Sequence, residues 1–194
     1  MSQKTFRKPF IALAAPSGGG KTTLCRMLLH KYPETCLSIS HTTRKPRGTE
    51  QNGVEYHFVD EPKFQELIQQ GAFIEWAKVH GNYYGTSRVF LEEQCRQGKV
   101  VLLDVDVQGV DSLKAAFGDR CLSVFVLPPD MLELEKRLRN RQTESEDKLQ
   151  ERLRNAQEEM SRAHDFDYRV INRDLNESIA ELCSIVEREV GLAK

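Results

Sequence analysis

Residues 15–22 read Ala-Pro-Ser-Gly-Gly-Gly-Lys-Thr, and this stretch decides the fold class. An apolar run at residues 10–15 precedes it, and a helix-forming run at residues 23–30 follows it. The glycines lack a Cβ atom, so successive backbone N–H groups can turn inward around an anion. The start of the helix adds unpaired N–H groups and the positive end of its dipole. A strand, a glycine-rich turn and a helix in this order predict a phosphate-binding loop.

Two residues at the end of this loop carry the side chains that such a site needs. Lys21 can reach the β- and γ-phosphates of a nucleoside triphosphate, and the hydroxyl of Thr22 is placed to ligate Mg²⁺. The motif G-x-x-x-x-G-K-[ST] begins with glycine, whereas this chain has Ala15 there, the smallest side chain with a Cβ atom. An ordinary glycine-rich turn before a helix is the alternative interpretation. The register of strand, glycines, Lys-Thr and helix favours the phosphate-binding loop.

The charge of the chain argues against one broad class of partners. The 194 residues include 28 Lys and Arg and 29 Asp and Glu, which gives a net charge of −1. General nucleic-acid binders carry an overall basic surplus, so we expect no nucleic-acid partner. A chain of this length holds one compact α/β domain with room for small insertions.

The spacing of the cysteines and the length of the apolar runs indicate the cellular compartment of the protein. The 5 cysteines lie at wide, irregular spacing without a C-x-x-C pair, so neither a disulfide framework nor a zinc site is predicted. The N-terminal residues lack the apolar run of a signal peptide, and no run is long enough for a transmembrane helix. We expect a soluble cytoplasmic protein with free thiols and no membrane partner. The sequence does not indicate an oligomeric state.

Strand-like and helix-like runs alternate along the chain, which favours a parallel sheet flanked by helices. The predicted strands cover residues 10–15, 37–40, 54–59, 73–79, 100–104, 122–127 and 168–171. The predicted helices cover residues 23–30, 61–70, 86–97, 110–117 and 175–190, with a charged helical stretch over 130–164 that is interrupted near 142–146. Residues 81–85, which begin and end with glycine, are predicted to form a turn.

These elements divide a single domain into a core, an insertion and a helical projection. The core covers about residues 9–41, 88–136 and 155–194, the insertion about 42–87 and the projection about 137–154.

A second group of basic residues follows the phosphate-loop helix. Arg44, Lys45 and Arg47 lie in one short loop, and guanidinium groups bind phosphate oxygens bidentately. Tyr56 and Tyr84 lie downstream, and phenol hydroxyls often complete phosphate sites. A solvated basic turn is the alternative interpretation of the loop.

A series of motifs covers nearly the whole chain, from about residue 9 to the C-terminus. In chain order they are A-P-S-G-G-G-K-T, S-H-T-T-R-K-P-R, G-V-E-Y-H-F-V, F-I-E-W-A, G-N-Y-Y-G-T-S, L-L-D-V-D-V-Q-G, R-L-R-N-R and V-I-N-R-D. Together these motifs resemble the guanylate kinase family. Each motif alone is weak to moderate evidence for the family. All of them in order, at family-like spacing, are highly specific evidence.

The resemblance implies a P-loop NTPase-type α/β fold, with an inserted small mixed α/β segment that binds the nucleoside monophosphate and a helical lid. It also implies transfer of the ATP γ-phosphoryl group to GMP, with Mg²⁺ accompanying ATP. The implied GMP-binding residues are Ser40, Arg44, Arg47, Tyr56, Glu75, Tyr84, Thr86, Asp104 and Asp106. The implied ATP-binding residues are Ala15, Pro16, Ser17, Gly18, Gly19, Gly20, Lys21, Thr22, Thr23, Arg137, Arg141 and Asn172.

The chemistry of guanine agrees with the assignment of Glu75. Guanine offers N1–H and N2–H₂ as adjacent donors that one carboxylate can accept together, whereas adenine leaves such a carboxylate unsatisfied. A strand residue that faces solvent is the alternative for Glu75.

Three arginines of the helical projection are the implied lid residues. Arg137 and Arg141 are spaced i and i+4 and share one helical face, and Arg152 lies beyond the interruption. Together with Lys21 and Arg44 they are the implied catalytic residues. This chain departs from the usual family pattern at Gln142, which replaces a glycine, and at Gly48-Thr49, which replaces Pro-Gly.

The sequence leaves two questions open. Asp104 follows an apolar strand, and it either touches Mg²⁺ through water or helps to order the GMP site. A catalytically silent guanylate-kinase-like interaction module is the alternative function, and a kinase of another small phosphate ester is a further competitor. The retained Lys21 and Thr22 argue against the module, and the set that includes Glu75 argues against the other kinase.

Overall fold

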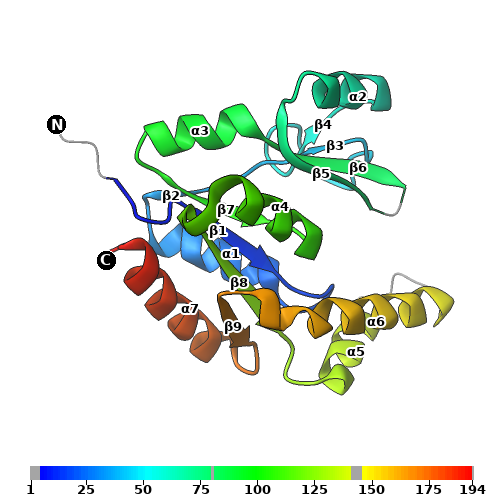
Figure 1. Cartoon of the computed structure of the whole chain (residues 1–194). Coiled ribbons are helices and arrows are strands. Elements are labelled where there is room, and N and C mark those ends of the chain that lie inside the picture. The colour runs from blue at the N-terminus through cyan, green and yellow to red at the C-terminus, as the bar shows by residue number, and fades with distance from the viewer. Residues whose placement is uncertain (1–4, 80, 141–145, 194) are drawn as a thin grey trace.

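A parallel sheet forms the centre of the computed structural model, which describes residues 5–79, 81–140 and 146–193. Its strand order is β2-β7-β1-β8-β9, and every neighbouring pair is parallel (Figure 1). The strands are β1 Phe10–Ala14, β2 Thr35–Leu37, β7 Val100–Asp104, β8 Cys121–Leu127 and β9 Tyr168–Ile171. Strands β1, β7 and β8 are almost wholly buried, which explains their continuous apolar sequences.

Helices cover both faces of this sheet. They are α1 Lys21–Lys31, α3 Arg88–Arg96, α4 Val107–Phe117 and α7 Leu175–Val190, and short 3₁₀ turns lie at Gly118–Arg120 and Ala163–Asp165. Ile11 and Leu13 of β1 belong to the core cluster that includes α1 and α7. Phe10 and Ala12 belong to the cluster that includes α3 and α4. The alternation of side chains along β1 therefore separates two apolar layers.

A second, mixed sheet with the order β4-β3-β6-β5 makes up most of the insertion. Its elements are β3 His41–Thr42, β4 His57–Phe58, β5 Phe73–Val79 and β6 Asn82–Ser87, with helix α2 Glu61–Gln69 against them. Strands β3 and β4 are parallel, and the other pairs are antiparallel. The ring of Phe64 in α2 stacks on Phe73 at 4.7 Å and on Tyr83 at 5.4 Å between centroids.

Two predictions about the insertion are wrong. Residues 82–85 belong to strand β6 and not to a turn, because all four pair with residues 76–79 of β5. Gly85 leaves room for two aromatic rings. A Cβ atom on Gly85 would approach Phe64 and Phe73 to 3.0 Å. The predicted strand at 54–59 is shorter, because only His57 and Phe58 form β4. The other predicted strands and helices are present, with ends that shift by a few residues.

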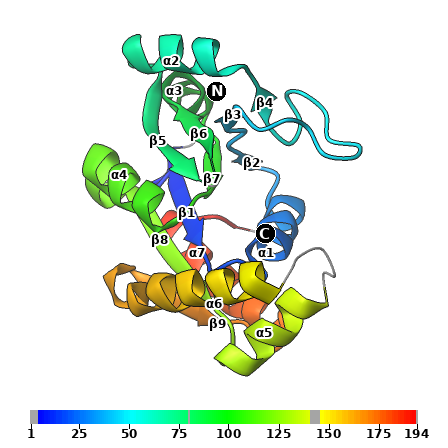
Figure 2. The ribbon, with the colours of Figure 1, turned by 90° about the vertical axis from the view of Figure 1, so that its right-hand side faces the viewer.

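Helices α5 Met131–Arg139 and α6 Glu146–Ser161 form a separate layer beside the phosphate loop. Leu134, Leu138, Leu149 and Ala156 form their common core. Figure 2 shows this pair and the insertion on opposite sides of the end of β1.

Candidate active site

The predicted phosphate loop joins β1 to α1 in the register that the sequence indicates. Gly18 and Gly20 have φ values of 91° and 94°, in the left-handed region that favours glycine. The backbone N–H of Gly19 donates to the carbonyl of Pro16 at 2.8 Å, which closes the turn. Helix α1 then begins at Lys21, so the loop precedes the free N–H groups of a helix start.

Asn172, which follows β9, supports this loop through a hydrogen bond to its backbone. Its side chain is buried, and Nδ2 donates to the carbonyl of Gly19 at 2.9 Å. A Cβ atom on Gly20 would overlap that amide, so the close approach requires glycine here. Arg137 of α5 donates from Nη2 to the Asn172 carbonyl at 3.1 Å and from Nε to Glu133 at 2.9 Å. Asn172 thus connects the loop to the helix that carries the predicted lid arginine.

Lys21 points from the start of α1 to the end of β7. Its Nζ lies 2.6 Å from Oδ1 of Asp104 and donates to the carbonyl of Val105 at 2.9 Å. Thr22 and Thr23 are exposed at the first turn of α1. The loop lysine and the carboxylate at the end of β7 therefore form one ion pair at the carboxyl edge of the sheet.

A cavity of about 170 Å³ opens beside this ion pair and reaches the insertion. Its lining residues are Lys21, Ser40, Tyr56, Glu75, Ala77, Val79, Tyr84, Asp104, Val105 and Asp106. Seven of these ten belong to the predicted site, although they come from segments far apart in the sequence. Predicted residues of the core and of the insertion thus line the same cavity.

Glu75 and Thr86 are paired across β5 and β6. The Thr86 hydroxyl donates to Oε1 of Glu75, and the hydroxyl itself is buried. Burial raises the pKa of the Glu75 carboxyl, and the nearby charge of Asp106 raises it further. The structure therefore places Glu75 in the cavity wall and not in solvent.

Arg44 lies between aromatic rings and a carboxylate. Its guanidinium lies 5.3 Å from the ring of Tyr56 and 5.8 Å from that of Phe58. It pairs with Glu50 at 2.9 Å, and the Tyr56 and Tyr84 rings meet edge to face at 5.9 Å. The structure thus brings together Arg44, Tyr56 and Tyr84 of the predicted phosphate site.

Two other predicted residues that the structure describes, Arg47 and Arg152, are not among the lining residues of this cavity. Arg47 is exposed, and its backbone contacts Glu50: its N–H donates to the Glu50 carboxylate at 2.7 Å, and its carbonyl accepts the Glu50 N–H at 3.0 Å. Arg152 is partly buried in α6. Arg141 lies outside the described residues, so its predicted place in the lid has no counterpart here.

Two carboxylates of this region were not found by sequence reasoning. Glu50 faces Arg44, and its signal is its position three residues after Arg47 in the same basic loop. Glu159 of α6 is partly buried near Asp106 and Lys21, and burial raises its pKa, with Asp106 adding to the rise and Lys21 opposing it. The sequence carries no signal for Glu159, because α6 is charged along its whole length.

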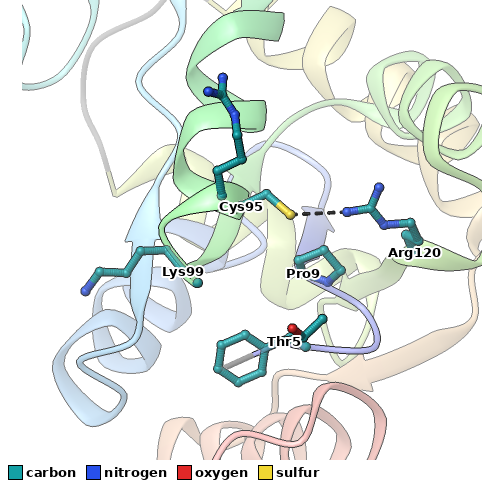
Figure 3. A pocket seen from close by; sticks show the side chains of 8 residues that line it. Thr5, Pro9, Cys95, Lys99 and Arg120 are labelled. Atoms are coloured by element: carbon teal, nitrogen blue, oxygen red, sulfur yellow. Dashed lines mark hydrogen bonds between the residues drawn. The ribbon is translucent and has the colours of Figure 1, made fainter. Parts of the chain in front are cut away.

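A larger cavity of about 490 Å³ lies at the opposite edge of the sheet, before the first residues of β1, β7 and β8 (Figure 3). The basic side chains that line it already have hydrogen-bond or ion-pair partners within the chain. Arg120 donates to Sγ of Cys95 at 3.1 Å, Lys99 donates to the Pro33 carbonyl at 2.9 Å, and Arg96 pairs with Glu93 at 3.2 Å. Figure 3 shows the Lys99 side chain extending away from the facing Cys95 and Arg120. These groups do not converge on a common point.

None of the helices in the described part of the chain has the length and apolar character needed to cross a membrane. The 5 cysteines are all free thiols, as predicted.

The family model "Guanylate kinase" matches residues 7–189. The chain belongs to the guanylate kinase family. It is 49% identical over 181 residues to the guanylate kinase of Dechloromonas aromatica, with 93% of this chain and 89% of that one covered. It is 47% identical over 176 residues to the guanylate kinase of Aromatoleum aromaticum, with 91% and 86% covered.

A solved structure of guanylate kinase from Anaplasma phagocytophilum is similar to this fold, with a TM-score of 0.77 and 31% identity. The match covers 97% of this chain and 87% of that one. The predicted fold class is confirmed: a phosphate-loop α/β fold with a parallel sheet between helices and a second, small mixed sheet.

Proposed function

We propose that this guanylate kinase family member transfers the γ-phosphoryl group of ATP to GMP, giving ADP and GDP. One observation carries the proposal: the cavity lined by Glu75 is also lined by Lys21, at the end of the phosphate loop, and by Asp104, which pairs with Lys21. A donor phosphate on the loop and an acceptor nucleotide in the cavity would therefore meet at Lys21.

The acceptor side is suited to a guanine nucleotide. Glu75, oriented by Thr86, accepts from N1–H and N2–H₂ of guanine, and a hydroxyl such as that of Ser40 donates to O6. Adenine lacks this donor pair and would leave the carboxylate unsatisfied, at a cost of roughly 1–3 kcal/mol. Arg44, Tyr56 and Tyr84 bind the acceptor phosphate, and Arg47 joins them when its side chain turns toward it.

The donor side is built mainly from the backbone. The N–H groups of the loop and the start of α1 hold the β- and γ-phosphates, and Lys21 leaves Asp104 to join them. Arg137 borders the loop through Asn172, and we assign Arg141 and Arg152 to the same lid. We take residues 42–87 as the GMP-binding segment and residues 137–154 as the lid.

The residues at the loop fit Mg²⁺. The cation takes oxygen ligands, keeps several waters and needs few carboxylates when phosphates are bound. Thr22 and Asp104 supply a hydroxyl and a carboxylate at the site, and residues 5–79, 81–140 and 146–193 hold no cluster of three or more metal-binding side chains. When bound, Mg²⁺ neutralises phosphate charge.

Catalysis then consists of positioning and charge neutralisation. A phosphate oxygen of GMP attacks the γ-phosphorus, and it is already largely ionised at neutral pH, so the chain needs no general base. Lys21 and the lid arginines stabilise charge on the transferred group, while Arg44 holds the acceptor against the repulsion of two anions.

The free thiols support a cytoplasmic location.

A panel of four nucleoside monophosphates tests the proposal. Purified protein with ATP and Mg²⁺ is expected to release ADP far faster with GMP than with AMP, CMP or UMP. Equal rates with AMP would remove the guanine assignment. Absence of turnover with every acceptor would support the silent interaction module instead.

A further inference from the structure

The guanidinium of Arg44 is held by a carboxylate of its own loop. Nη1 and Nη2 of Arg44 donate to Oε2 and Oε1 of Glu50, each at 2.9 Å. The same Oε2 accepts the backbone N–H of Arg47 at 2.7 Å, and the N–H of Glu50 donates to the Arg47 carbonyl at 3.0 Å. One carboxylate therefore orders both arginine positions of the basic loop.

The pattern of these bonds leaves a defined part of Arg44 for a ligand. A guanidinium has five N–H groups. Glu50 takes one from each Nη atom, and the Lys45 carbonyl takes the second of Nη1 at 2.8 Å. The remaining N–H groups, on Nε and Nη2, lie on one edge and form a fork that matches two oxygens of a phosphate. The side chain of Tyr84, another residue of the proposed phosphate site, also interacts with this guanidinium.

Burial explains why Arg44 needs a partner before any phosphate arrives. Only 10% of its side chain is exposed, and a cation removed from water requires compensation. The bond from Arg44 and the N–H of Arg47 hold the pKa of Glu50 below its ordinary value, so the carboxylate is ionised at neutral pH. A long side chain that is already ordered also loses less entropy when it binds.

We propose that Glu50 is a positioning residue for the acceptor phosphate, acting through Arg44 and the backbone of Arg47. The inference rests on the proposed function, in which this loop binds the phosphate of GMP. The alternative is that Glu50 competes with the phosphate for Arg44, since a carboxylate repels phosphate and occupies the arginine. The geometry favours positioning, because Glu50 uses the end of the guanidinium and leaves the side fork to the ligand.

The variant Glu50→Gln tests the role with little change in volume. Because bonds to charged groups are worth about 10- to 100-fold in affinity, we expect KM for GMP to rise by about that factor. We expect kcat and KM for ATP to stay within about twofold of the wild type. Glu55→Gln is the matched control, since the Glu55 carboxylate also accepts a loop N–H, that of Gln51 at 2.7 Å, and not a bond from Arg44.

Guanosine separates positioning from a merely structural role. Guanosine lacks the phosphate, so its inhibition constant should be the same for Glu50→Gln and the wild type. Equal weakening of guanosine and GMP would mean that the loop has lost its fold, and it would overturn the proposal. A lower KM for GMP would identify Glu50 as a competitor and would also overturn it.

The experiment distinguishes this inference from the proposed function. A wild-type protein that does not phosphorylate GMP removes the proposed function. A wild-type protein that does so, with an unchanged KM in Glu50→Gln, removes only the role of Glu50.

Discussion

The two proposed nucleotide sites of this chain are built from different groups. The phosphate loop presents backbone N–H groups, and its shape depends on glycines and on the Asn172 amide behind Gly19. The insertion presents side chains that are held in pairs, Glu75 by Thr86 and Arg44 by Glu50.

This difference separates binding strength from selectivity. Backbone N–H groups bind any phosphate chain and do not contact a base. A buried carboxylate accepts only from a base with matching donors, so it discriminates. We therefore expect changes in the loop to affect all acceptors alike, and changes in the insertion to alter which acceptor is used.

The largest expected effect concerns the loop lysine. Removing one preorganised charge from a transferring phosphoryl group costs about 10²–10³-fold in rate, so Lys21→Met should lower kcat by that factor. The loss should be the same with GMP and AMP, as measured by ADP release. Lys31→Met on the same helix is the control, because Lys31 pairs with Glu187 at 3.5 Å, away from the loop. A loss confined to GMP would contradict the division between the two sites.

The pair in the insertion predicts a smaller and more selective effect. Thr86→Val keeps the shape but removes the donor to Glu75. One hydrogen bond to a charged group is worth about tenfold, so KM for GMP should rise by about that factor while KM for ATP is unchanged. Ser112→Ala, which removes a hydroxyl from the exposed face of α4, should change neither value. Equal changes in both KM values would show that the insertion and the loop are not independent.

The raised pKa of Glu75 predicts a pH dependence of base binding. The carboxylate accepts from guanine only when ionised, and it is protonated as pH falls through a pKa above the ordinary value of 4.5. Guanosine should therefore bind the wild type more weakly in mildly acidic solution than at neutral pH, as measured by calorimetry. Guanosine avoids the titration of the GMP phosphate itself. Glu75→Gln should bind it weakly with no such slope, and a wild type without the slope would contradict this role.

The smallest expected effect concerns the support behind the loop. Asn172→Ala removes the buried donor to the Gly19 carbonyl and introduces no charge. KM for ATP should rise by about three- to tenfold, since roughly one neutral hydrogen bond is lost, and KM for GMP should not change. Asn155→Ala on the exposed side of α6 is the control. A change confined to GMP would show that Asn172 serves the acceptor site.

Much of the fold could be predicted from local sequence. Buried strands such as β7 and β8 read as continuous apolar runs, and the phosphate loop combines glycines with a helix start. Strand β6 could not be predicted in this way. Its glycine serves tertiary packing, where the rings of Phe64 and Phe73 fill the space that a side chain at Gly85 would take.

The residues of the candidate site likewise fall into those that the sequence predicts and those that depend on tertiary contacts. Lys21 was predicted from its motif, and Glu75 from a resemblance over the whole chain. Asp104 was left open, and the structure pairs it with Lys21 in the cavity wall. Glu50 and Glu159 were missed because a carboxylate's role depends on which cations and walls face it, and sequence spacing does not give this.

Our main inference is that Glu75 of the insertion reads the base. The most direct test measures kcat/KM for GMP and for AMP at saturating ATP in the wild type and in Glu75→Gln. We expect a strong preference for GMP in the wild type, a fall of about tenfold or more in the GMP/AMP ratio in the variant, and an unchanged KM for ATP. An unchanged GMP/AMP ratio would contradict the claim, because Glu75 would then not read the base.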